Sequence, residues 1–187
     1  MEASFSDAVA LTKEFLESKE TERTFSLIVA AFVKALESGH RVLVCGNGGS
    51  LSDAMHFAEE WTGRFREERK PLPVLALSDP AHITCVGNDF GFEYIFSRMV
   101  EAWGSEGDIL VVLTTSGRSP NIIEAARVGR EKKMTVIGLL GKGGGEVKSL
   151  CDIALVAPGK TTDRIQELHM IILHTLTEVV ERNVVKK

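Results

Sequence analysis

Apolar residues three and four positions apart recur through residues 5–38. This spacing places the apolar side chains on one face of a helix and predicts two amphipathic helices in this segment. Gly39 follows directly. We expect it to end the second helix, because glycine readily adopts the backbone conformation found just beyond helix ends.

Beyond Gly39, short apolar runs alternate with glycine- or serine-rich turns and further helical segments. The runs contain many β-branched residues and lack polar alternation, which is typical of strands covered on both faces in a parallel sheet. The alternation of strands and helices predicts a doubly wound α/β sandwich. Five strands are expected at residues 41–45, 73–77, 108–113, 135–140 and 153–156, and helices at about 51–65, from 120 to about 133, and at about 162–182.

The length of 187 residues suits one domain with a substantial core. We expect a single domain over residues 1–187, with N-terminal helices at 1–38 and an α/β core at 41–187. The sequence contains no linker or low-complexity segment.

Composition narrows the choice of compartment and partners. A net charge of −4 without a basic block makes nucleic acid a poor partner. The first residues do not resemble a signal peptide, and no run approaches the roughly 20 apolar residues of a membrane span. The three cysteines are scattered, which argues against a disulfide framework or a cysteine-rich metal site. We therefore expect a cytoplasmic protein without membrane or nucleic-acid partners.

The turn Gly46-Asn47-Gly48-Gly49-Ser50 follows the first expected strand and opens a helix. Free backbone N–H groups and the helix dipole favour an anion at such a place. The turn matches neither the dinucleotide fingerprint nor the P-loop, whose lysine is missing. A tight turn without a ligand is the alternative interpretation.

A second turn, residues 114–120, carries four hydroxyl groups after the third strand. Ser119 is placed to cap the next helix and Pro120 to begin it. The other hydroxyls, on Thr114, Thr115 and Ser116, suggest a phosphate monoester held by neutral donors. The alternative is a hydroxyl-rich turn that serves the helix cap alone.

His56 and Glu60 lie four residues apart and therefore share one helix face. An imidazole and a carboxylate suit a divalent metal such as zinc, and they also suit proton transfer. A solvated surface pair has the same spacing, so spacing alone leaves both interpretations open.

The last helix carries further polar candidates among apolar residues, namely Asp163, Gln166, His169 and His174. Gln166 and His174 are eight residues apart, roughly 12 Å along the helix axis. Both could reach one ion only by leaning together, unless different subunits supply them. Asn88 and Asp89 have the character of a turn between two helices.

Four segments together resemble bacterial phosphoheptose isomerases, a branch of the sugar-isomerase (SIS) fold; they are GNGGSLSDAMHFAEEWTGRF, HITCVGNDFGFEYIFSR, TTSGRSPN and DRIQELHMIILH. The resemblance covers nearly the whole chain. It implies a three-layer αβα sandwich with a mostly parallel five-stranded sheet, and N-terminal helices that pack in an oligomer. It also implies isomerisation of sedoheptulose 7-phosphate to D-glycero-D-manno-heptose 7-phosphate through an enediol. This reaction begins nucleotide-heptose biosynthesis for products such as lipopolysaccharide.

The resemblance also implies residue roles. Glu60 and His174 match the acid/base pair, and one zinc ion per subunit is expected among His56, Glu60, Gln166 and His174. The expected substrate-binding residues are Asn47, Gly48, Gly49, Ser50, Glu60, Asn88, Asp89, Thr114, Thr115, Ser116, Ser119 and Gln166. A homotetramer with interfacial active sites is implied, which would relieve the strain between Gln166 and His174.

Two departures from the family pattern are small. Arg118 replaces an amide in the second turn, and Leu51 stands where some members have a polar residue. Some relatives with this fold are adaptors that bind a replication-initiator protein, and a sugar-phosphate sensor is a third possibility. An adaptor has no need for His56, Glu60 and His174 together, so the sequence favours the enzyme.

Overall fold

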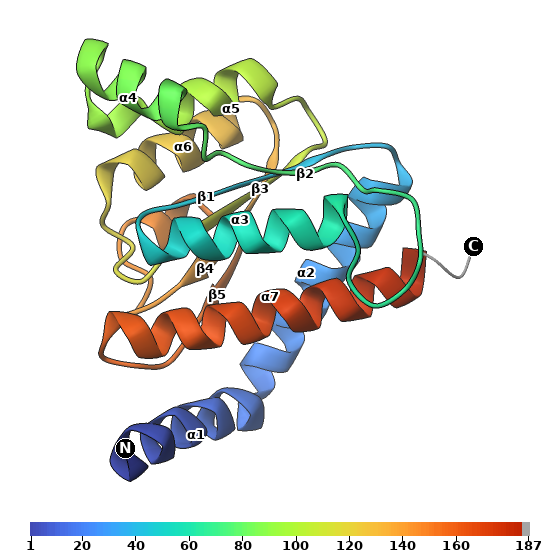
Figure 1. Ribbon diagram of the computed structural model, residues 1–187, viewed down its shortest axis with the longest axis vertical. Coiled ribbons are helices and arrows are strands. Elements are labelled where there is room, and N and C mark those ends of the chain that lie inside the picture. Colours follow the sequence, from blue (N-terminus) through green and yellow to red (C-terminus); the bar gives the residue numbers. More distant parts are fainter. Residues whose placement is uncertain (185–187) are drawn as a thin grey trace.

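Five parallel strands form the centre of the protein in a computed structural model that describes residues 1–184 (Figure 1). They are β1 (Val42–Gly46), β2 (Val74–Ala76), β3 (Ile109–Thr114), β4 (Thr135–Leu140) and β5 (Ile153–Val156), in the spatial order β2-β1-β3-β4-β5. The predicted five-stranded parallel α/β sandwich is thus confirmed. Residues 185–187, the end of the expected domain, lie outside the described part.

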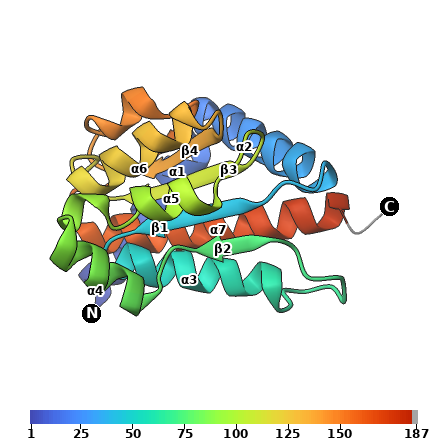
Figure 2. The ribbon, with the colours of Figure 1, turned by 90° about the horizontal axis from the view of Figure 1, so that it is seen from above.

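Helices cover both faces of this sheet (Figures 1 and 2). The helices are α1 (Glu2–Glu17), α2 (Lys19–Glu37), α3 (Gly49–Thr62), α4 (Pro80–Asp89), α5 (Ser97–Trp103), α6 (Pro120–Glu131) and α7 (Thr162–Val184), with 3-10 turns at Phe92–Tyr94 and Val147–Leu150. The α2, α3 and α7 helices pack on one face, and α4, α5 and α6 pack on the other.

Alternate residues of each strand enter two different hydrophobic cores. Val42 and Val44 of β1 belong to the core under α2, α3 and α7, whereas Leu43 and Cys45 belong to the core under α5 and α6. Successive side chains of a strand point to opposite faces, so both sets must be apolar when both faces are covered. This burial explains why the strands lack polar alternation.

Three buried aromatic rings join α2 to α3. The ring centroid of Phe32 lies 6.1 Å from that of Phe57 and 6.0 Å from that of Trp61. Phe57 and Trp61 are one helical turn apart in α3 and contact each other edge to face. These contacts pack α3 against α2 within the core on this face of the sheet.

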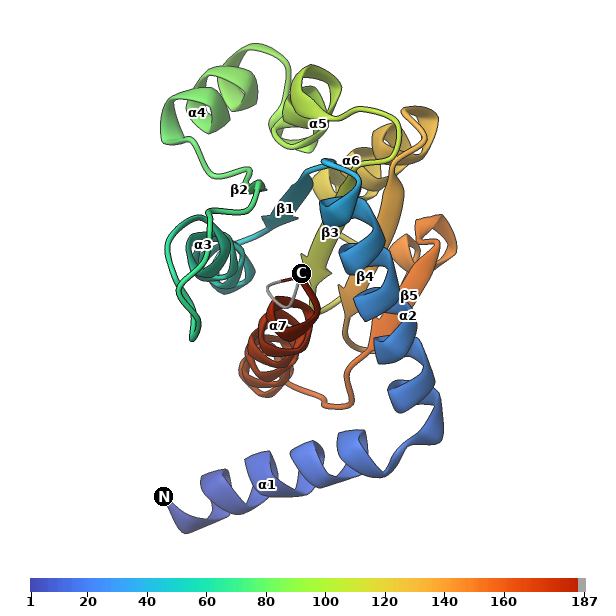
Figure 3. The ribbon, with the colours of Figure 1, turned by 90° about the vertical axis from the view of Figure 1, so that its right-hand side faces the viewer.

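The α1 helix projects from the body of the protein, as Figure 3 shows, and none of its residues is buried. Large apolar side chains of α1 are therefore exposed, among them Phe5 and Leu16. Within residues 1–184, no helix combines the length and apolar character needed to cross a membrane.

Most predicted boundaries differ from the observed ones by a few residues, while β4 and β5 match the prediction. The helix predicted from residue 51 begins at Gly49 and ends at Thr62, before Phe65, because the chain leaves helical geometry at Gly63 (φ −90°, ψ −111°). Asn88 and Asp89 were expected in a turn, but they form the last turn of α4. That helix begins at Pro80 with the Asp79 carboxylate as its cap, 2.7 Å from the backbone nitrogen of His82.

The N-termini of α3, α6 and α7 lie at the carboxyl edge of the sheet, on the left of Figure 1. The glycine-rich turn leads into α3 and the hydroxyl-rich turn leads into α6. This edge is where ligands bind in open α/β sheets.

The second turn packs directly on the loop after β4. Gly117 has φ +63°, and a Cβ atom there would lie 1.9 Å from the carbonyl oxygen of Gly144. Gly143 also has a positive φ, +81°, but has open space around its Cα. Position 117 therefore requires glycine for two reasons, its positive φ and the lack of space for a Cβ atom.

We expect Gly117→Ala to lower the free energy of unfolding by more than about 3 kcal/mol, because the added methyl group meets backbone that cannot move freely. Gly143→Ala is the matched control and should cost about 1 kcal/mol from backbone strain alone. Urea unfolding of both variants measures the difference. Equal losses would show that the turn does not need the close approach.

Candidate active site

The first turn is built around the missing side chains of its glycines. A Cβ atom on Gly46 would lie 2.7 Å from the backbone oxygen of Ser50, so the strand can pass directly beneath the first turn of α3 only as glycine. Gly48 has φ +55° and open space beside it. The turn therefore leaves backbone accessible at the N-terminus of α3.

Asn47 and Asn121 tie the two turns together. Each side-chain amide donates to the other's carbonyl oxygen, and both distances are 2.8 Å. Asn121 lies in the first turn of α6 and is buried. The pair holds the N-terminus of α6 beside the first turn. The N-termini of α3 and α6, each of which favours an anion, therefore lie close to each other.

The hydroxyl groups of the second turn have different roles. The buried Thr114 hydroxyl accepts a hydrogen bond from the backbone nitrogen of Gly117 at 3.1 Å, so it shapes the turn. Thr115 Oγ1 lies 3.4 Å from Thr162 Oγ1 at the start of α7. Ser119 occupies the predicted cap position and Pro120 begins α6, but the Ser119 hydroxyl makes no capping bond. This hydroxyl remains available to a ligand.

Gln166 lies against the first turn. Its Nε2 donates to Ser50 Oγ at 3.2 Å, and a Cβ atom on Gly49 would lie only 2.7 Å from its Oε1. Gly49 therefore makes room for Gln166. Within this chain, Gln166 therefore lies against the glycine-rich turn 46–50 and not against the His56–Glu60 pair.

Glu60 lies between two imidazole rings. Its Oε1 is 3.2 Å from Nε2 of His56 and 3.8 Å from Nε2 of His174. The ring centroids of His56 and His174 are 5.0 Å apart, and the rings meet edge to face. The structure thus brings together three of the four residues expected around a metal.

The three side chains differ in how far they are exposed to solvent. The Glu60 side chain is 14% exposed, against 46% for His56 and 40% for His174. The Phe65 ring stacks on His174 with centroids 6.0 Å apart. The contacts of Glu60 with the two imidazoles involve its Oε1, and no hydrogen bond of Oε2 is found among residues 1–184.

The donor atoms of the three residues are close enough to hold a divalent metal ion. One ligand atom from each lies within 4.8 Å of the others. Zinc bonds of about 2.0–2.2 Å in tetrahedral geometry place ligand atoms roughly 3.3–3.5 Å apart, close to the two distances measured from Glu60. Two histidines and one glutamate also form a known type of catalytic zinc site, which keeps one position open.

Asn88 and Asp89 lie on exposed helical surface at the end of α4. Asn88 Nδ2 donates to Asp89 Oδ1 at 2.6 Å, and the Cys85 thiol lies 3.7 Å from Asp89 Oδ2. Figures 1 and 2 place α4 near the carboxyl edge of the sheet. Their predicted role in substrate binding stays a prediction.

Sequence reasoning did not single out Asn121, Phe65 or Asp53. Burial raises the pKa of Asp53, which lies one turn before His56, and the nearby His56 partly offsets this rise. Asp53 Oδ2 is buried and has no hydrogen-bond partner among the described residues. The one available signal for Asp53 was its three-residue spacing from His56, which puts both on neighbouring positions of α3.

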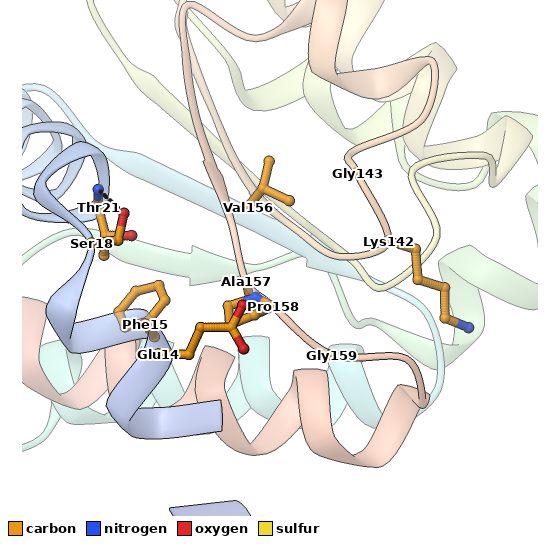
Figure 4. Close-up of a pocket in the computed structure, with 10 residues that line it drawn as sticks. All are labelled: Glu14, Phe15, Ser18, Thr21, Lys142, Gly143, Val156, Ala157, Pro158 and Gly159. Atoms are coloured by element: carbon orange, nitrogen blue, oxygen red, sulfur yellow. Dashed lines mark hydrogen bonds between the residues drawn. The ribbon is translucent and has the colours of Figure 1, made fainter. Parts of the chain in front are cut away.

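A separate hollow lies between the α1–α2 junction and the loops after β4 and β5 (Figure 4). Its lining includes Glu14, Phe15 and Lys142, and Lys142 points away from the other side chains drawn. The hollow contains no residue of the triad formed by His56, Glu60 and His174. It is therefore distinct from the candidate active site.

The fold and the two turns define the chain as a SIS-domain protein, and the SIS domain family model matches residues 4–141. A phosphoheptose isomerase of Fusobacterium nucleatum is 49% identical over 96% of this chain and 93% of its own. A phosphoheptose isomerase of Salmonella paratyphi B is 46% identical over 96% of this chain and 94% of its own.

Two solved structures are also similar to this chain. A phosphoheptose isomerase from Francisella tularensis superposes with a TM-score of 0.92 at 38% identity, covering 97% of this chain and 96% of the other. One from Neisseria gonorrhoeae has a TM-score of 0.90 at 35% identity with the same coverage. The chain therefore belongs to the phosphoheptose isomerase family.

His169 lies between Gln166 and His174 along α7 and is fully buried. Its Nε2 donates to the Leu140 carbonyl oxygen at the end of β4, at 3.2 Å, while Nδ1 has no hydrogen-bond partner among the described residues. Burial lowers the pKa of His169 from 6.5 to about 4, and the bond to Leu140 only partly offsets this. The ring is thus neutral in the folded state at pH 7.

Because the folded pKa lies below the unfolded one, acid destabilises the fold as the unfolded chain takes up a proton that the native ring cannot. The loss begins as pH falls through about 6.5 and levels off below about 4. We expect the wild-type protein to lose about 2 kcal/mol more than His169→Gln between pH 7 and pH 5. Urea unfolding at several pH values measures this, and parallel pH profiles for the two proteins would contradict it.

Proposed function

We propose that this protein interconverts sedoheptulose 7-phosphate and D-glycero-D-manno-heptose 7-phosphate, the first step of nucleotide-heptose biosynthesis. Family membership supports the reaction. The observation that carries the proposal is the Glu60 carboxylate, held 3.2 and 3.8 Å from two imidazoles, on the same helix whose N-terminus follows the glycine-rich turn. An aldose–ketose isomerase needs this combination of anion site and acid/base groups.

The two turns would bind the phosphate group and the neighbouring sugar hydroxyls. The backbone around Gly48 and the free Ser119 hydroxyl are suitable neutral donors, and the N-termini of α3 and α6 favour a negative charge. Binding the phosphate at one end orients the reacting carbons at the other. Asn88 and Asp89 are proposed to contact the substrate from the end of α4.

Glu60 is the proposed base. Its carboxylate removes a proton from C1 of the ketose and returns it to C2, so that an enediol lies between the two sugars. His174 is the proposed acid: it supplies a proton to the C2 oxygen as the enediol forms and takes one back from the C1 hydroxyl as the enediol collapses. A carboxylate and an imidazole differ enough in basicity for one to start ionised and the other to carry a proton near pH 7.

One zinc ion per subunit is proposed at His56 and Glu60, and His174 Nε2 would join them as a ligand only when it carries no proton. Gln166 would be a further ligand only from a neighbouring subunit, because within one chain it lies against Ser50, roughly 12 Å along α7 from His174. Bound zinc would polarise the substrate carbonyl and stabilise negative charge on its oxygen. The second carboxylate oxygen, Oε2 of Glu60, would stay available for the proton. We also propose a cytoplasmic homotetramer with interfacial sites, in which the exposed apolar side chains of α1 would be covered.

We expect Glu60→Gln to lower kcat for sedoheptulose 7-phosphate about 10³-fold, because the amide cannot accept the carbon-bound proton. The KM should change little, since the phosphate-binding turns are untouched. The assay uses protein of measured zinc content, so that loss of metal and loss of the base are told apart.

Glu59→Gln is the matched control. Glu59 is the neighbouring, 64% exposed carboxylate, and its Oε1 also lies 3.8 Å from His56 Nε2. We expect near-normal turnover from this variant. Comparable losses in both variants, or near-normal turnover in zinc-loaded Glu60→Gln, would rule out Glu60 as the base.

A further inference from the structure

Arg69 lies beyond the C-terminal end of α3 and caps this helix with its side chain. Its Nη2 donates to the Glu60 carbonyl oxygen at 2.7 Å, and its Nη1 donates to the Trp61 carbonyl oxygen at 2.8 Å. Carbonyls of the last helical turn have no partner within the helix, and the negative end of the helix dipole favours a cation there. The guanidinium also lies over the Trp61 ring, 5.7 Å from its centroid.

Glu181 of α7 receives the remaining side of the same guanidinium. Its Oε1 accepts from Arg69 Nε at 2.8 Å, and its Oε2 lies 3.3 Å from the backbone nitrogens of Arg66 and Glu67. The side chains of Arg69 and Glu181 are only 4% and 2% exposed. The ion pair is thus buried and hydrogen-bonded on both sides.

A buried ion pair of this kind is weak evidence for stability, because removing two charges from water offsets most of their attraction. The pair instead determines how the end of α3 is positioned relative to α7. The planar fork of arginine fixes direction as well as distance, so the end of α3 has a defined position along α7.

The position of the end of α3 along α7 affects how Glu60 and His174 face each other. The carbonyl held by Arg69 belongs to Glu60 itself, whose carboxylate lies 3.8 Å from His174. His174 precedes Glu181 by seven residues, about two helical turns, so both lie on the α7 face toward α3. The same residue of α3 is therefore tied to α7 twice, through its backbone and its side chain.

We propose that the Arg69–Glu181 pair is a positioning device that sets the separation of Glu60 from His174 for proton transfer. The inference rests on the roles proposed above for these two residues. Neither Arg69 nor Glu181 contacts the substrate in this account, and both act through the alignment of α3 with α7.

The test replaces both charges together, with Arg69→Met/Glu181→Leu, so that no single charge stays buried. We expect a cooperatively folded protein whose kcat falls by about 10-fold or more while KM stays within about twofold, because misplaced reacting groups slow chemistry more than binding. Arg69→Lys is the second variant. It keeps the charge opposite Glu181 but lacks the fork, so kcat should again fall.

Arg66→Met is the matched control. It removes the neighbouring, more exposed Arg66–Glu178 ion pair, 2.7 Å long, which also joins this segment to α7 but holds no α3 carbonyl. We expect kcat and KM close to wild type. A folded double variant or Arg69→Lys with unchanged kcat, or with a loss confined to KM, would overturn the proposal.

Crystal structures of the wild-type protein and the variants give a readout that needs no activity. We expect the Glu60 Oε1 to His174 Nε2 separation to shift by more than about 0.5 Å when the pair is replaced. An unchanged separation would overturn the inference even if the reaction assigned to the protein were wrong. An inactive wild-type protein with a shifted separation would instead refute the proposed reaction and retain the positioning role.

Discussion

The candidate active site depends on the side-by-side alignment of α3 and α7. Both helices start at the carboxyl edge of the sheet and run in the same direction (Figures 1 and 2). Polar contacts join them at three levels: Gln166 with Ser50, His174 with Glu60, and Glu181 through Arg69 with the end of α3. The apolar core beneath supplies most of the stability of this packing, whereas the polar contacts specify which residues face each other.

This alignment also explains why two kinds of chemistry lie on the same pair of helices. The N-terminal end of α3 presents backbone and small residues, which suit an anion. Glu60 lies ten positions after Ser50, roughly 15 Å along the helix axis, and meets His174 there.

Much of the fold was predictable from the sequence. Strands buried on both faces of the sheet consist of continuous apolar residues, and the run at residues 135–140 matches β4. The His56–Glu60 pair was predictable from helical spacing. Contacts between distant residues were not: Asn47 meets Asn121 and Arg69 meets Glu181 only through tertiary packing, and single polar residues carry no periodic signal. The turn expected at Asn88-Asp89 was wrong because the cap at Asp79 and the helix it starts override local turn preference.

The central claim is that Glu60 moves a proton between C1 and C2. Isomerisation of sedoheptulose 7-phosphate in ²H₂O, followed by NMR, tests it most directly. A proton carried on the carboxylate exchanges with solvent, so the account predicts deuterium at C2 of the aldose and, on reversal, at C1 of the ketose. Complete retention of the substrate hydrogen in the product, together with near-normal turnover of zinc-loaded Glu60→Gln, would indicate direct hydride transfer and contradict the account.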